Sequence, residues 1–252
     1  MTNFIDINSD VGERPEALAD GREEELLSLV SSANIACGVH AGDASTMERV
    51  IQLCARHDVN IGAHPSYPDR ENFGRVEMKL PPGEIEKSLE SQVRVLMEIA
   101  ERFHRRMRHV KAHGALYNVA AKNSLVAEAI AAGVKRVDNR LILLGLAGSQ
   151  MLDVWRRLGF EVVAEAFADR RYEADGSLRS RKLPGALISD PSEAVDQVLG
   201  IVKGGTVMTA DGRKVTLEAR TICVHSDTEN AIAIARAIRE ALPKEGIEVR
   251  PL

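Results

Sequence analysis

The sequence predicts an α/β fold, a barrel-like (β/α) arrangement of about seven parallel strands. Apolar runs of strand length alternate with stretches in which apolar residues recur at spacings of three and four, as in amphipathic helices. This alternation implies a parallel sheet with right-handed crossovers. Polar, titratable residues follow at least six of the strands, and a closed barrel brings all those strand ends to one face more readily than an open sheet. We expect one domain over residues 1–252.

Seven apolar runs have the length of strands. Several are apolar nearly throughout, as expected for strands that are covered on both faces. In chain order they are residues 4–9, 33–37, 60–64, 109–113, 141–145, 161–166 and 221–225.

Helical patterns connect these strands. The longest covers residues 81–103 and begins with two prolines, which suit the first turn of a helix. The other predicted helices are residues 43–57, 124–132, 149–158 and 228–242.

Two stretches interrupt the alternation of strands and helices. Residues 169–188 read as a long polar loop rich in arginine, directly after a strand. Loops of this length in compact domains are usually functional lids or disordered segments. Residues 204–219 predict a β-hairpin, with Asp211 and Gly212 at the turn.

Composition argues against several functional classes. The net charge is −4, with 33 Lys and Arg interspersed among 37 Asp and Glu, which argues against a nucleic-acid-binding surface. No apolar run approaches the roughly 20 residues needed to span a bilayer, and the chain starts without a signal-peptide pattern. We therefore expect a cytoplasmic protein with no membrane partner. Cys37, Cys54 and Cys223 are odd in number and widely spaced, so we expect free thiols.

The opening tract DINSDVGE places Asp6, Asn8 and Asp10 on one face of a strand, because side chains alternate with a period of two. These groups would lack partners in an apolar core, so they are expected to face a polar pocket, a metal or a network of donors. Alternatively, Asp10 and Glu13 cap the loop that follows.

Histidines recur just after the predicted strands, at His40, His64, His113 and His225. A lone histidine in a strand is usually a core residue, but repetition at parallel positions favours one shared pocket. Asp43 follows two glycines, and it either contacts a ligand or caps the next helix.

The tract VKAHGALYN places Lys111 and His113 on one strand face. A buried lysine is costly unless it meets an anion, which here is a substrate or a carboxylate such as Glu165. His225 and Asp227 repeat the pattern at the last strand.

Familiar motifs for phosphate binding, dinucleotide binding, serine hydrolysis and zinc proteolysis are absent from the sequence. A metal bound by Asp10, His64 and His113 is compatible with the preference of zinc and its neighbours for carboxylate and imidazole ligands. The sequence leaves the presence of a divalent metal open.

The succession DINSDVGE, SANIACGVHAGD, GAHPSYPD, FGR, VKAHGALYN, EAFADRRY and ICVHSD resembles the LamB/YcsF family from Asp6 to about Asp227. The chain has Ala112 where the family tends to have proline, and Ser226 where it tends to have glycine. Both differences concern local loop geometry. The resemblance implies a barrel-like α/β fold related to the glycoside hydrolase/deacetylase group.

The resemblance also implies an activity, the ATP-dependent hydrolysis of 5-oxoproline to L-glutamate. A chain of this family would act as the A subunit of a 5-oxoprolinase complex with partner subunits B and C, and ATP would be a co-substrate. The missing nucleotide motif fits a division of labour in which the partners handle ATP, although an atypical site on this chain stays open.

The chemistry assigns expected roles to the candidate residues. Water that attacks an activated lactam must give its proton to a group with a pKa near neutrality, and cations must hold the substrate carboxylate and the developing charge. Candidates for base and proton transfer are Asp10, His64, His113 and Glu165. Candidates for anion binding are Lys111, Arg170 and Arg179, and those for contacting or orienting the substrate are Asn8, His40, Asp43, His225 and Asp227.

Two other functions compete with this interpretation. The first is a metal-dependent deacetylase or hydrolase acting on a sugar or an amide. The second is a non-catalytic subunit that binds a small carboxylate for a partner.

Overall fold

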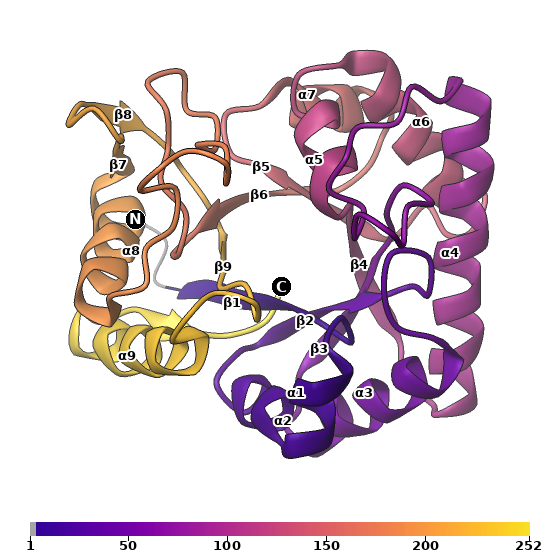
Figure 1. Cartoon of the computed structure of the whole chain (residues 1–252), viewed down its shortest axis with the longest axis horizontal. Helices are drawn as coiled ribbons and strands as arrows, with labels where there is room; N and C mark the ends of the chain where they lie inside the picture. The colour runs from indigo at the N-terminus through magenta and orange to yellow at the C-terminus, as the bar shows by residue number, and fades with distance from the viewer. Residues whose placement is uncertain (1–3) are drawn as a thin grey trace.

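Seven parallel strands close into a barrel in the computed structural model, which describes residues 4–252 (Figure 1). The neighbours follow chain order from β1 to β6, and β9 then pairs with both β6 and β1. The predicted barrel of about seven parallel strands is confirmed. Its strands are β1 (Phe4–Val11), β2 (Ser32–Ala36), β3 (Asn60–His64), β4 (Met107–Lys111), β5 (Ile142–Leu146), β6 (Val162–Phe167) and β9 (Thr221–Cys223).

Helices surround the ring of strands on its outside (Figure 1). The five predicted helices correspond to α3 (Ala44–Arg56), α4 (Pro82–Arg102), α6 (Ser124–Lys135), α7 (Gln150–Arg157) and α9 (Ala231–Lys244). Four further helices were not expected from the sequence: α1 (Pro15–Asp20), α2 (Arg22–Leu27), α5 (Gly114–Ala120) and α8 (Pro191–Gly204). None of the helices in the described part of the chain combines the length and apolar character needed to cross a membrane.

The two interruptions of the pattern have different structures. The predicted hairpin is confirmed as β7 (Thr206–Met208) paired antiparallel with β8 (Lys214–Thr216). Residues 169–188 contain no helix or extended strand, only isolated bridges. Tyr172 anchors this loop, because its ring is fully buried and its hydroxyl accepts a hydrogen bond from the Phe167 backbone N–H at 2.8 Å.

Two strands end two residues earlier than predicted. β4 ends at Lys111 and β9 at Cys223, so His113 and His225 lie in the segments that follow these strands. The backbone turns at Gly114, where φ is +57° and α5 begins, so β4 cannot continue. A short strand near the C-terminus, β10 (Glu248–Val249), pairs in parallel with the start of β1.

The inside of the barrel is polar where β1 faces it. Asp6 is fully buried and accepts hydrogen bonds from the hydroxyls of Ser31 and Ser32, each at 2.7 Å, and of Thr221. Burial raises the pKa of the Asp6 carboxyl to about 6, because these hydrogen bonds offset only part of the desolvation. The predicted polar face of the first strand is therefore a hydrogen-bonded core layer at this depth. The cysteines at positions 37, 54 and 223 are free, as expected, and all three are buried.

Candidate active site

A cavity of about 770 Å³ opens at the carboxyl ends of the strands. In a parallel α/β barrel this is the face on which loops from every strand meet. The predicted residues that line the cavity come from β1, β3, β4 and the segments after β4, β6 and β9. They are Asp10, His64, Lys111, His113, Arg170 and His225.

Lys111 forms the cationic centre of the cavity floor. Its side chain is buried, and Nζ lies 3.0 Å from Asp10 Oδ1, 2.9 Å from Glu165 Oε1 and 3.1 Å from Cys223 Sγ. Burial alone would lower the pKa of Lys111, but Asp10 and the other neighbours outweigh burial and hold this pKa well above its ordinary value. The side chain is therefore a charged ammonium group.

Glu165 lies beneath Lys111 and is fully buried. Its Oε1 also accepts a hydrogen bond from Asn8 Nδ2 at 3.0 Å, and its Oε2 accepts one from the Tyr117 hydroxyl at 2.7 Å. Asn8 is itself held by Asn34, whose Nδ2 donates to Asn8 Oδ1 at 2.7 Å. Both carboxylate oxygens of Glu165 are thus engaged by protein groups, which suits holding Lys111 in place.

Three histidines and a glutamate meet on the other side of Asp10, and we call Glu13, His40, His64 and His113 the histidine cluster. The Glu13 Oε1 atom lies 3.0 Å from His40 Nε2 and 3.1 Å from His113 Nδ1. His64 Nε2 lies 3.0 Å from His113 Nδ1 and 3.4 Å from Asp10 Oδ2. The rings of His40 and His113 stack, with centroids 4.0 Å apart. Asp10 therefore joins Lys111 to the histidine cluster.

The neighbouring charges keep both carboxylates of this region ionised. Burial would raise the pKa of Asp10, but His64 and Lys111 outweigh burial and lower this pKa well below its usual range. Burial would likewise raise the pKa of Glu13, yet hydrogen bonds from His113 and His40 lower it. Burial lowers the pKa of His40 to about 4, so that this ring is neutral near pH 7.

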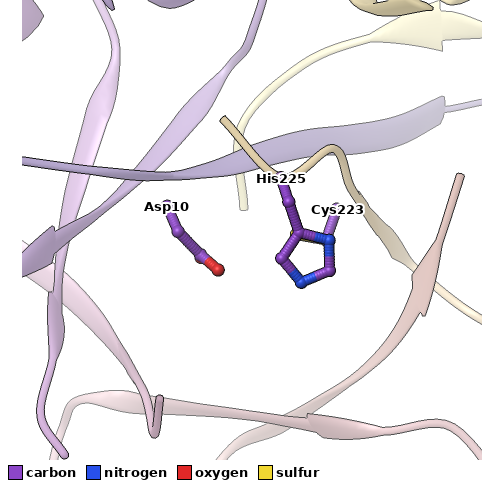
Figure 2. A group of neighbouring side chains, drawn as sticks. All are labelled: Asp10, Cys223 and His225. Carbon is purple, nitrogen blue, oxygen red and sulfur yellow. The ribbon is translucent and has the colours of Figure 1, made fainter. Parts of the chain in front are cut away.

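His225 reaches the cavity from the segment after β9, near Asp10 but outside the histidine cluster. Its Nδ1 lies 2.9 Å from Asp169 Oδ1, and its ring stacks on Phe167. Asp169 is fully buried and also accepts hydrogen bonds from the His225 backbone N–H and from the Thr228 hydroxyl. Figure 2 shows Asp10, on β1, and His225, on the segment after β9, projecting into the same space.

Arginines gather at the rim of the cavity. Arg75 and Arg181, from two different loops, both pair with Asp227, with Nη–Oδ2 distances of 2.5 Å and 2.8 Å. Arg170 donates from Nη2 to the Arg179 carbonyl oxygen at 2.7 Å, while its buried Nε has no hydrogen-bond partner among residues 4–252. Burial lowers the pKa of Arg170 to about 10.

Twelve site residues were predicted from the sequence. Two of them, both predicted to bind the substrate, lie apart from the other ten. Asp43 is exposed and caps α3, where its Oδ1 accepts a hydrogen bond from the Thr46 backbone N–H at 2.8 Å. Arg179 pairs with Glu173 and donates to the Pro184 carbonyl oxygen. A role for either residue in substrate binding stays a prediction.

Four residues of the site were not predicted as site residues: Glu13, Arg75, Tyr117 and Arg181. The first three lie in sequence tracts that had been recognised as motifs. Glu13 entered only as a possible loop cap, and the turn at Gly12, where φ is +73°, directs the chain back toward the cavity. Tyr117 follows His113 by four residues, the spacing that places two side chains on one helix face. Arg75 belongs to the FGR tract, while Arg181 is one of several arginines in the loop and nothing in the local pattern distinguishes it.

Comparisons with known proteins agree on one family. The sequence model of the LamB/YcsF family matches residues 5–252. A protein of Chloroflexus aggregans, named as the A subunit of 5-oxoprolinase, is 50% identical over 246 residues, covering 98% of each chain. Its namesake in Bordetella pertussis is 46% identical over 250 residues and 99% of each chain. The crystal structure of the lactam utilization protein of Thermus thermophilus superposes with a TM-score of 0.91 at 41% identity, covering 99% of this chain and 100% of that one.

Proposed function

The chain belongs to the LamB/YcsF family, and we propose that it hydrolyses 5-oxoproline to L-glutamate as the A subunit of an ATP-dependent 5-oxoprolinase. The names of relatives that are 46% and 50% identical over nearly the whole chain support this substrate. The observation that carries the proposal is the cavity itself, in which Asp10, His64 and His113 surround a point beside the Lys111 ammonium group. Such a site offers both proton acceptors and a fixed positive charge.

The substrate is a small carboxylate, and the rim of the cavity is cationic. We assign the substrate carboxylate to the arginines there, with Arg170 as the first candidate because its buried Nε–H has no protein partner among the described residues. Arg75 and Arg181 both bind Asp227, and a second carboxylate could replace Asp227 in these contacts.

The amide bond of a five-membered lactam resists water because resonance stabilises its carbonyl group. Transfer of the terminal phosphoryl group of ATP to the carbonyl oxygen would release ADP and activate the ring carbon. Water then adds to this carbon and the C–N bond breaks, so that the nitrogen leaves as an amine after taking a proton. A second water releases phosphate and leaves L-glutamate.

The residues of the cavity suit the proton transfers of this sequence. In a metal-free site, Asp10, His64 and His113 are the candidates for taking the proton of the attacking water and returning one to the leaving nitrogen. A metal ion held by them would instead lower the pKa of the attacking water. Lys111 would stabilise negative charge that develops on the carbonyl oxygen. We give Glu165 the role of positioning Lys111, because all of its contacts are with protein groups.

A second function is favoured by one observation, the grouping of Asp10, His64 and His113 with ligand atoms within 4.8 Å of one another. A metal-dependent hydrolase of an amide would use such a set without ATP. The requirement for ATP separates the two functions.

The test is the release of glutamate from 5-oxoproline by this chain alone and by mixtures with the candidate B and C subunits, each with and without ATP. We expect turnover only in the complete mixture with ATP, and its loss when this chain is omitted. Turnover that persists without this chain would contradict the proposal, as would failure of every mixture in which the partners are folded and associated. Turnover that needs a metal but no ATP would support the second function.

A further inference from the structure

We infer that the chain binds a divalent transition-metal ion, of the zinc type, between Asp10, Glu13, His64 and His113. The ligand atoms of Glu13, His64 and His113 lie within 3.6 Å of one another, and Asp10 Oδ2 lies beside His64 Nε2. His113 Nδ1 lies 3.0 Å from His64 Nε2 and 3.1 Å from Glu13 Oε1. His64 Nε2 lies 3.6 Å from the same Glu13 oxygen and 3.4 Å from Asp10 Oδ2. All four side chains are buried.

The hydrogens of the two imidazole rings point away from this centre. His64 Nδ1 lies 2.8 Å from the Lys111 carbonyl oxygen, and His113 Nε2 lies 2.9 Å from the Phe73 carbonyl oxygen. Because a carbonyl oxygen only accepts hydrogen bonds, both of these nitrogens must carry a hydrogen. In the neutral rings, His64 Nε2 and His113 Nδ1 are then bare lone pairs that face each other and the two carboxylates.

With both rings neutral, no hydrogen lies among these four atoms, and each added proton satisfies only part of the contacts. A proton on His64 Nε2 that points to His113 Nδ1 leaves the lone pairs of His113 Nδ1 and Glu13 Oε1 facing each other across 3.1 Å. Protons on both rings would pair each ring with a carboxylate but would place two imidazolium cations with their nitrogens 3.0 Å apart. A single cation at the centre is attracted to all four atoms at once.

Four of the six separations among these ligand atoms also fit a metal ion. Metal–nitrogen bonds of about 2.0–2.1 Å in a tetrahedral zinc site separate neighbouring ligand atoms by about 3.3 Å. The four separations given above lie between 3.0 Å and 3.6 Å. Two carboxylates and two imidazoles form a ligand set that zinc and its neighbours in the first transition row accept.

Further contacts hold these ligands in orientation, as is usual around metal sites. The two backbone carbonyl oxygens fix the tautomers of His64 and His113. His40 Nε2 lies 3.0 Å from Glu13 Oε1, and Lys111 Nζ binds Asp10 Oδ1, which leaves Asp10 Oδ2 for the metal.

Another group in the same cavity consists of Asp10, Cys223 and His225, which Figure 2 draws. The Lys111 ammonium group lies 3.0 Å from Asp10 Oδ1 and 3.1 Å from Cys223 Sγ, so a positive charge already occupies this corner. His225 is bound by Asp169 through Nδ1. Repulsion by Lys111 therefore disfavours a metal ion here and favours the centre between the histidines.

Metal content of the tag-free, full-length chain tests this inference, followed by calorimetric titration of the chelator-treated chain with Zn²⁺. We expect about one bound ion per chain in the wild type and at least tenfold weaker binding in Asp10→Asn and in His113→Gln. The matched control is His225→Gln, which changes a histidine of the same cavity that pairs with Asp169 instead of the proposed ligands, and it is expected to bind Zn²⁺ like the wild type. No bound ion in the wild type, or loss of binding in His225→Gln with retention in His113→Gln, would overturn the inference.

If a variant fails to fold, the absorption spectrum of the metal-free wild-type chain loaded with Co²⁺ still tests the inference. Ligation by nitrogen and oxygen alone gives visible d–d absorption without a thiolate-to-metal charge-transfer band in the near ultraviolet. We expect this spectrum, whereas a charge-transfer band would place the ion at Cys223 and overturn the assignment. The inference does not rest on the proposed substrate, so stoichiometric binding without glutamate release would contradict only the proposed function.

Discussion

Lys111 shows how one residue can determine the character of a site. Its ammonium group touches carboxylates from β1 and β6, so three strands of the barrel meet at one buried charge. Removing one partner of a buried ion pair leaves an uncompensated charge in a region of low dielectric constant. The unpaired Asp10 and Glu165 would then repel each other across the cavity floor.

Lys111→Met is therefore expected to lower the free energy of unfolding by about 3–5 kcal/mol, the range typical of a broken buried pair. The control is Lys122→Met, which changes a lysine whose side chain is 65% exposed and should shift the free energy of unfolding by less than about 1 kcal/mol. Urea denaturation monitored by circular dichroism measures both values. Equal stability of the two variants would show that Lys111 is not a buried charge in the folded protein.

Glu23 makes a second prediction at this scale, which concerns pH. Its Oε2 accepts a hydrogen bond from the Gly12 backbone N–H at 3.0 Å, while its buried Oε1 has no partner among the described residues. Burial raises the pKa of Glu23 from 4.5 to about 7. Between these pH values the unfolded chain has released a proton that the folded chain keeps, so the stability contributed by this group falls as pH rises.

Glu23→Gln is expected to remove this dependence and to stabilise the protein by up to about 3 kcal/mol above pH 7, since each pKa unit corresponds to about 1.4 kcal/mol. The measurement is the free energy of unfolding across the interval from pH 4.5 to about 7. The exposed Glu71→Gln serves as a control and should leave the slope of the wild type unchanged. Identical slopes in wild type and Glu23→Gln would contradict the account.

At the residue scale, the sequence predicted the histidines of the site better than their partners. His40, His64 and His113 could be grouped because each follows an apolar run, a pattern that one sequence displays. The position of Glu13 depends on a turn at Gly12 and on contacts with segments far along the chain. Such contacts leave no local pattern.

At the scale of the elements, close approach of loops positions His113. The loop after β3 passes so near the start of α5 that a Cβ atom on Gly114 would lie 2.6 Å from the Gly74 carbonyl oxygen. Both glycines have positive φ, at +57° and +63°. Here glycine is required twice, for the backbone conformation and for the space.

Gly114→Ala is expected to destabilise the protein by roughly 1–3 kcal/mol more than Gly148→Ala, because it adds a clash with backbone to the strain of positive φ. Gly148 is a matched control, since its φ is +77° and a Cβ atom there would meet nothing within 4 Å. Thermal unfolding of the two variants gives the comparison. Equal losses of stability in the two variants would mean that the loop at Gly74 does not contact the start of α5.

Three of the four helices that the sequence did not predict share a physical cause. α1, α2 and α5 have only six or seven residues, which is too short for the apolar repeat to be recognised. α8 is longer and carried a signal that could have been used, Asp190 followed by Pro191, in which the aspartate side chain accepts from the Ser192 and Glu193 backbone N–H groups. Strands and long amphipathic helices were predicted because each carries its own periodicity.

At the scale of the whole molecule, closure of the barrel creates the site. β1 pairs with β2 on one side and with β9 on the other, so Asp10 lies between segments from near the start and near the end of the chain. An open sheet with the same elements would leave His225 and the histidine cluster at separate edges. The barrel could be predicted because polar residues recur after so many strands, whereas the individual contacts could not.

The central claim is that this cavity, with Asp10 at its centre, performs the chemistry of 5-oxoproline hydrolysis. The most direct measurement is kcat for glutamate formation by the complex reconstituted with Asp10→Asn, compared with Asp153→Asn, which changes an exposed aspartate on α7. We predict a loss of at least about 100-fold for Asp10→Asn, the lower range for loss of a group that transfers protons, and turnover within a few-fold of the wild type for Asp153→Asn. Turnover by a folded, associated Asp10→Asn complex within a few-fold of the wild type would contradict the claim.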